Sequence, residues 1–148
     1  MKPCKKIILA AAGALGIVAV VVGCRFIWPD MAAVQGAELS DCEVIEHAEA
    51  GMRRAPLTLN AEEEARLREW LGTLRGMRLD INSYVPILEL KGKRFNINFQ
   101  ERCTIVCYAP SADAKTWLQV SRAARPEDAH MAAWLRSKLP SGQQHTTH

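Results

Sequence analysis

The sequence predicts a single α+β domain: a small antiparallel sheet of about four to five strands, two helices packed on one face, and a hydrophobic helix before the domain. The expected strands follow one another instead of alternating with helices. Two later segments each carry a single apolar stripe at helical spacing, so both can cover the same sheet face. The chain of 148 residues has room for one such domain, expected at residues 41–140, with a loose tail at 141–148.

The first 24 residues have the layout of an export signal or membrane anchor. Lys2, Lys5 and Lys6 precede Ile7 to Cys24, a run without any charged residue. These three lysines account for the whole formal charge of +3, so the remainder of the chain is electrically balanced. The basic composition therefore describes the leader and does not indicate a nucleic-acid partner.

The apolar run ends in Val21-Val22-Gly23-Cys24, which resembles the lipobox of bacterial lipoprotein precursors. The resemblance covers the leader only, and it implies lipid attachment at the Cys24 sulfur and cleavage before that residue. An uncleaved anchor is the alternative, because Ile7 to Trp28 spans about 33 Å as a helix and a hydrocarbon core is about 30 Å thick. Ordinary signal cleavage is a third reading. Each places the domain outside the cytoplasm, in a bacterial envelope or periplasm, and the first two fasten it to a membrane.

The first part of the domain is expected to hold one strand and one helix. Residues 25–40 are small and lack periodicity, so we expect a tether, followed by a strand from Asp41 to His47 that Gly51 to Pro56 interrupts. The clearest helix runs from Ala61 to Arg75, with Asn60 as its N-cap and Glu63 completing a capping box. Its apolar stripe consists of Leu67, Trp70, Leu71 and Leu74.

The second part is expected to be strand-rich and to end in a helix. Phe95, Ile97 and Phe99 alternate with asparagines, so one face of that strand is buried. Lys91-Gly92-Lys93 is typical of a tight hairpin turn. The predicted elements are strands at Tyr84 to Leu90, Arg94 to Phe99, Cys103 to Ala109 and Thr116 to Arg122, and a helix at Pro126 to Leu139.

Three cysteines fall in the predicted domain, in a compartment that permits disulfides. Cys103 and Cys107 lie about 13 Å apart along one strand, which is too far for a bond that needs Cα atoms within about 7 Å. Cys42 pairs with Cys103 or Cys107 if their strands are neighbours. Otherwise all three are small buried hydrophobic residues. A catalytic thiol needs a base, for example His47 beside Cys107.

The sequence contains no Gly-x-Ser-x-Gly motif, no glycine-rich phosphate loop and no CxxC pair. We therefore expect neither an enzyme nor a cofactor or metal site, but a binding or interaction lipoprotein whose partner is an unknown protein or small ligand. An inhibitor or immunity-type protein against an envelope enzyme or toxin is the alternative. The expected interaction face consists of Lys91, Lys93, Arg94, Asn96 and Asn98.

Overall fold

The structure is a computed structural model that describes residues 29–49 and 51–140. The leader with its expected hydrophobic helix, the lipid-attachment residue Cys24 and the tail from residue 141 lie outside the described residues. Within the described ranges, none of the helices has the length and apolar character needed to cross a membrane.

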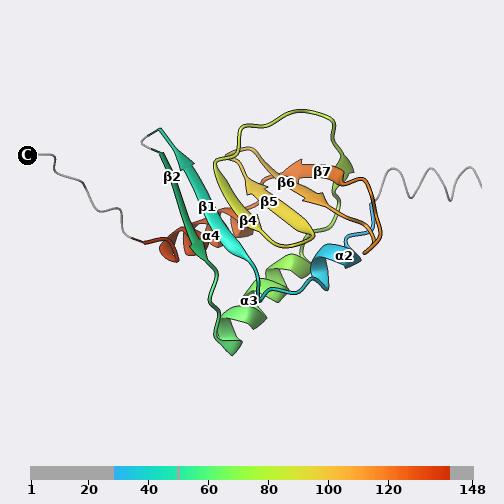
Figure 1. The fold of residues 1–148 in the computed structure, drawn as a ribbon. Coiled ribbons are helices and arrows are strands. Elements are labelled where there is room, and N and C mark those ends of the chain that lie inside the picture. Colours follow the sequence, from blue (N-terminus) through green and yellow to red (C-terminus); the bar gives the residue numbers. More distant parts are fainter. Residues whose placement is uncertain (1–28, 50, 141–148) are drawn as a thin grey trace, which may run out of the picture.

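The described residues form one antiparallel sheet of seven strands with helices on one side, which confirms the α+β class (Figure 1). The sheet has more strands than the four to five expected, and its order is β2-β1-β4-β5-β6-β7-β3. The strands are β1 (Glu43–Ala48), β2 (Gly51–Pro56), β3 (Arg78–Leu79), β4 (Leu88–Lys91), β5 (Phe95–Phe99), β6 (Cys103–Tyr108) and β7 (Leu118–Ala123).

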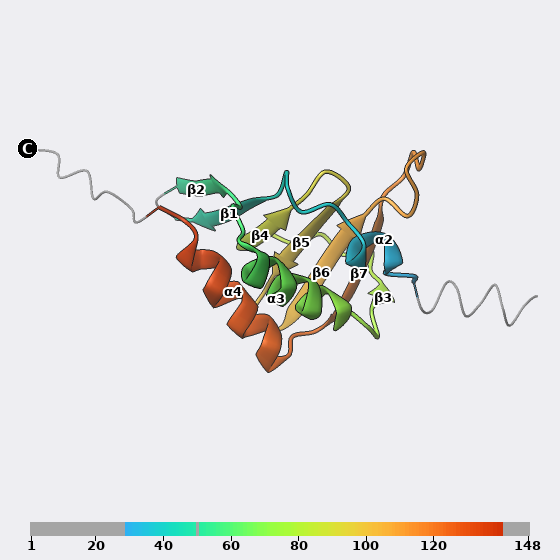
Figure 2. The ribbon, with the colours of Figure 1, turned by 90° about the horizontal axis from the view of Figure 1, so that it is seen from below.

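Three helices lie on the same face of this sheet: α2 (Ala32–Gln35), α3 (Ala61–Gly72) and α4 (Pro126–Ser137) (Figure 2). The predicted capping box of α3 is confirmed, because Asn60 accepts a hydrogen bond from the Glu63 backbone N–H and the Glu63 side chain accepts one from the Asn60 N–H. Pro126 occupies the first turn of α4, as expected, since a proline there loses no helical hydrogen bond.

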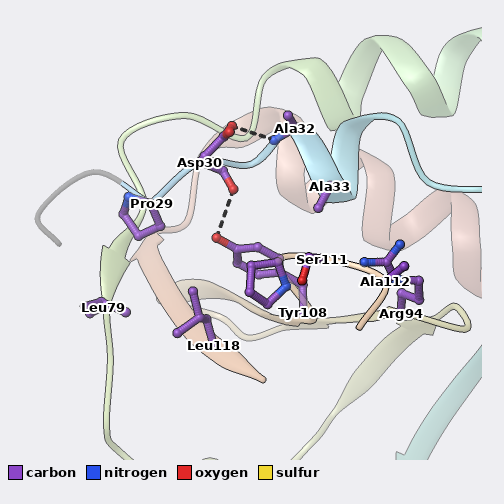
Figure 3. Close-up of a pocket in the computed structure, with 11 residues that line it drawn as sticks. Pro29, Asp30, Ala32, Ala33, Leu79, Arg94, Tyr108, Ser111, Ala112 and Leu118 are labelled. Atoms are coloured by element: carbon purple, nitrogen blue, oxygen red, sulfur yellow. Dashed lines mark hydrogen bonds between the residues drawn. The ribbon is translucent and has the colours of Figure 1, made fainter. Parts of the chain in front are cut away.

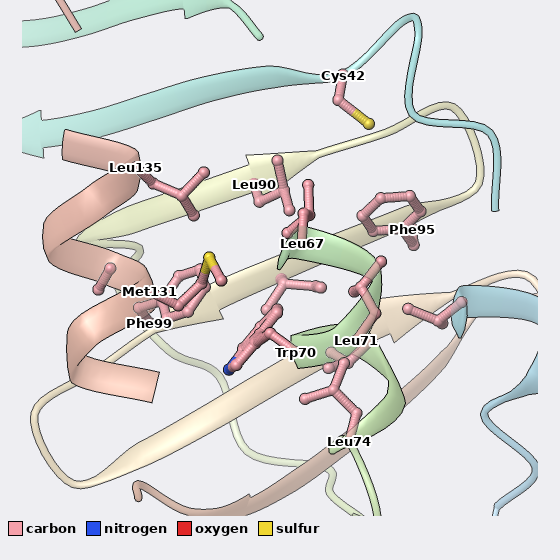
Figure 4. Packing of buried hydrophobic residues seen from close by; sticks show 14 of the residues in the cluster. Cys42, Leu67, Trp70, Leu71, Leu74, Leu90, Phe95, Phe99, Met131 and Leu135 are labelled. Carbon is pink, nitrogen blue, oxygen red and sulfur yellow. The ribbon is translucent and has the colours of Figure 1, made fainter. Parts of the chain in front are cut away.

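The core lies between the sheet and these helices (Figure 4). The α3 stripe points at Phe95 and Phe99 of β5, and the rings of Trp70 and Phe99 stack with centroids 5.3 Å apart. Met131 and Leu135 close the core from α4. Gly92 is required in the confirmed β4–β5 hairpin, because a Cβ there would lie 2.4 Å from the Phe95 ring.

Three segments that the sequence left outside the sheet and core belong to them, and the short strand β3 is one of these. Gly51–Pro56, expected to interrupt the first strand, is the edge strand β2, and its arginines Arg53 and Arg54 pair with Glu46 and Glu43 of β1. Residues 29–40, expected as part of a tether, contain α2 and bury three side chains. These are Met31, Val34 and Leu39.

The expected strand at Tyr84 to Leu90 is wrong over most of its length, because β4 begins only at Leu88. Residues 80–87 form a loop that joins β3, at one edge of the sheet, to β4 near the other edge. The loop runs against the sheet face that points away from the helices, here called the outer face. Its backbone oxygens at Asn82 and Val85 accept hydrogen bonds from the side chains of Gln119 and Gln100.

Candidate functional site

A pocket of about 630 Å³ opens at the end of the domain where the described chain begins (Figure 3). This volume falls in the range of pockets that hold small ligands. Segments distant in sequence meet here: the start of α2, the end of β3, β6, β7 and the loop at residues 110–117. Most of the wall is apolar or small, and these residues are Pro29, Ala32, Ala33, Leu79, Tyr108, Pro110, Ala112 and Leu118.

Tyr108 fixes the beginning of the described chain to the sheet. Its hydroxyl donates a hydrogen bond of 2.9 Å to the backbone oxygen of Asp30, across 78 residues of sequence. Burial, and then the charge of Asp30, raise the pKa of Tyr108, so the hydroxyl stays protonated and remains a donor. The Asp30 carboxylate accepts from the N–H of Ala32, the first residue of α2, at 2.9 Å. One wall of the pocket is therefore held in place by polar contacts.

Arg94 supplies a positive charge in the pocket wall. Its guanidinium donates one long hydrogen bond, 3.4 Å, to the backbone oxygen of Ala109. Among the described residues, no acidic side chain forms an ion pair with Arg94. A half-buried guanidinium with donors to spare favours an anionic group on a ligand.

The other residues of the expected interaction face lie elsewhere. Asn96 and Asn98 lie on the outer face, where Asn96 donates to Glu89 at 3.3 Å and Asn98 accepts from the Ile87 N–H at 3.4 Å. Lys91 lies 3.7 Å from Glu43, and Lys93 is exposed in the hairpin. Strand addition at β5 is not open to a partner, because β4 and β6 pair with both of its edges.

The expected disulfide between Cys42 and Cys103 or Cys107 is corrected by the order of the strands. Strands β4 and β5 lie between β1 and β6, so the cysteines are separated by about three strand spacings, or about 14 Å. All three thiols are free. The same separation keeps His47 away from Cys107, so the expected thiol–imidazole pair does not form. His47 instead faces Glu89 at 3.5 Å.

The described residues contain no cluster of histidine, cysteine or acidic side chains suited to a metal ion. Comparison of the chain with protein-family models, curated proteins and solved structures finds no match. The geometry of the pocket is therefore the basis for a functional argument.

Of the pocket residues, the sequence singled out only Arg94. Asp30 lay in the expected tether and Tyr108 near the end of an ordinary strand, and neither belongs to a local motif. A usable signal was the single aromatic hydroxyl in an otherwise apolar buried strand, because a buried tyrosine needs a hydrogen-bond partner. Nothing in the sequence named that partner, since Asp30 and Tyr108 are far apart along the chain.

Proposed function

We propose that this chain is a membrane-tethered binding protein of a bacterial envelope, with its domain outside the cytoplasm and its ligand site in the Arg94 pocket. The ligand has an apolar body and one anionic group. The apolar run at residues 7–24 with its lipobox-like end supports the tether. The observation that carries the binding role is Arg94, a cation without an acidic partner among the described residues, in a largely apolar pocket.

The ligand chemistry follows from the pocket wall. Leu79, Leu118 and the Tyr108 ring offer contact to an apolar body, which gains from leaving water. Arg94 offers charged hydrogen bonds to a carboxylate, sulfonate or phosphate. The Asp30 carboxylate already accepts the Ala32 N–H and discourages a second negative group close to it. An amphipathic monoanion therefore fits better than a polyanion.

Fluorescent titration with anilinonaphthalene sulfonate, followed by displacement with dodecanoate, tests the site. We expect Arg94→Gln to weaken dodecanoate binding about tenfold, since a charged hydrogen bond is lost. Lys93→Gln removes the neighbouring exposed cation and leaves the affinity unchanged. Equal affinities for Arg94→Gln and the parent protein would refute the site.

The tether has a separate test in the full chain expressed in a bacterium. Incorporation of radiolabelled palmitate, lost in Cys24→Ser, supports the lipid anchor. Membrane retention without label supports the uncleaved helix. Recovery of the full chain in the soluble cytoplasmic fraction contradicts the proposed location.

A further inference from the structure

We propose that the edge of the sheet beside the pocket docks onto the surface of the membrane, with Leu79, Ile81 and Trp117 entering its interfacial layer. This inference rests on the proposed tether and adds a second, direct contact between the domain and lipid. The exposed fractions of these three residues are 41%, 99% and 49%, which is high for large apolar side chains.

The backbone pairing of β3 with β7 brings the three residues to one corner of the domain. Leu79 is in β3 opposite Val120 of β7, and Asp80 continues this pairing through its N–H to the backbone oxygen of Gln119 at 3.0 Å. Ile81 follows directly, and Trp117 immediately precedes β7. Leu79 lines the same pocket as Pro29 (Figure 3). Leu79 therefore places the corner beside the pocket that the first described residue, Pro29, also lines.

The first described residue lies only a few positions along the chain from the proposed tether. This short distance identifies lipid as the partner that covers the corner. Cys24, the expected lipid-attachment residue, lies five residues before Pro29. Five extended residues span at most about 17 Å, so Pro29, and with it the pocket edge that contains Leu79, remains close to the headgroups of the bilayer. With an uncleaved anchor the distance is shorter still, because Trp28 then lies at the interface. Both forms of the tether present the same corner to the membrane.

The chemistry of the corner suits the interfacial layer. Tryptophan favours this layer because its ring is apolar and its N–H is polar. Lys115 and Arg78 are exposed beside Trp117 and Leu79, where cations meet anionic headgroups. The described C-terminal residues lie at the opposite end of the domain from α2 and β3, and so away from this corner (Figures 1 and 2).

Two other exposed apolar residues serve as internal controls. Val85 is 81% exposed in the same loop as Ile81, but its backbone oxygen accepts from Gln100, at the opposite end of β5 from Arg94. Met52 is 57% exposed near the turn between β1 and β2. Neither lies at the corner, so neither is expected to touch lipid.

The test uses the full chain reconstituted into vesicles of phosphatidylethanolamine and phosphatidylglycerol, with or without bromine on the acyl chains. The emission of Trp117 is obtained by subtracting the spectrum of Trp117→Phe from that of the parent. We expect brominated lipid to reduce this emission at least twofold. The emission of Trp134 on α4, obtained with Trp134→Phe, is expected to stay unchanged. Equal Trp117 emission in both kinds of vesicle overturns the inference.

Ile81→Ser and Val85→Ser form the matched pair of variants. Both positions are exposed, so both proteins are expected to fold. Ile81→Ser should at least halve the bromine quenching of Trp117 and increase its quenching by aqueous iodide, whereas Val85→Ser should change neither. Equal behaviour of the two variants overturns the inference. Shielding of Trp117 from iodide without bromine quenching also overturns it, since a second copy or the chain itself then covers the corner.

Sedimentation with the vesicles separates this inference from the proposed tether. Protein that sediments with vesicles while Trp117 stays unquenched refutes docking and leaves the tether standing. Protein that fails to sediment refutes the tether, and the docking proposal fails with it.

Discussion

Asp128 of α4 and Arg122 of β7 form an ion pair inside the domain, with 2.7 Å between oxygen and nitrogen and side chains only 3% and 4% exposed. The same carboxylate accepts hydrogen bonds from the Trp70 indole at 3.0 Å and from the Thr104 hydroxyl at 2.8 Å. Arg122 also donates to the backbone oxygen of Thr73, where α3 ends. One buried carboxylate therefore joins both long helices to the sheet.

Asp128→Ala is expected to lower the free energy of unfolding by about 3–5 kcal/mol, because it leaves the buried Arg122 charge without a partner. Guanidinium unfolding followed by tryptophan fluorescence measures the effect. Asp113→Ala, which removes an exposed carboxylate, serves as the control and is expected to change stability by less than about 0.5 kcal/mol. A similar small change for Asp128→Ala would show that the network contributes little.

Asn60→Ala is expected to cost about 1 kcal/mol, because α3 loses the side-chain acceptor for the Glu63 N–H. Asn60→Gly is the informative comparison, since glycine at an N-cap costs only a few tenths of a kcal/mol. Helical signal and unfolding midpoint measured together separate the two variants. An unchanged unfolding midpoint in Asn60→Ala would indicate that the cap hydrogen bond does not stabilise the fold.

Local patterns in the sequence predicted the parts of the fold that have local causes. The stripe of α3, its cap and the turn at Gly92 each follow from residues a few positions apart. The edge strand β2 was missed because Gly51 and Pro56 are turn formers, whereas its pairing depends on Glu43 and Glu46 of another strand. Adjacent arginines such as Arg53 and Arg54 are typical of an exposed loop. They also fit an edge strand when the partner strand supplies acidic side chains opposite them.

The candidate site was harder to predict because its residues meet only through the order of the strands. Arg94 and Tyr108 come from neighbouring strand ends, but Pro29 and Asp30 reach them through a hydrogen bond that no spacing rule reveals. The expected cysteine pairing failed for the same reason, since it required β1 beside β6. Periodicity determines which face a side chain occupies and leaves the neighbouring strand undetermined.

Glu46 is expected to make the domain sensitive to acid. Hydrogen bonds from Arg53, then from Arg136, hold the pKa of Glu46 below its ordinary value of 4.5. A lowered pKa contributes stability that is present above pH 4.5 and is lost as the pH falls through the folded-state value. Glu46→Gln should therefore be less stable than the parent at neutral pH, and the difference should shrink on acidification.

Unfolding midpoints measured from neutral pH down to acid give this comparison. Glu49→Gln, which changes an exposed acid at the end of the same hairpin, is the control. Its unfolding midpoint should depend on pH in the same way as that of the parent. If the difference in unfolding midpoint between Glu46→Gln and the parent stays constant with pH, the contacts of Glu46 with Arg53 and Arg136 do not stabilise the fold.

Cys42 is expected to make the domain sensitive to alkali. Burial, and then the charge of Asp41, raise the pKa of the Cys42 thiol from 9.0 to about 11. The folded state thus holds this proton more tightly than the unfolded chain, and the resulting stability is complete below pH 9 and lost as the pH rises toward 11. In Cys42→Ala the decline of stability over this interval should be shallower than in the parent. Cys103→Ala, at a less buried thiol, should change the slope of stability against pH by less. Identical slopes for the parent and Cys42→Ala would contradict the burial of a protonated thiol at Cys42.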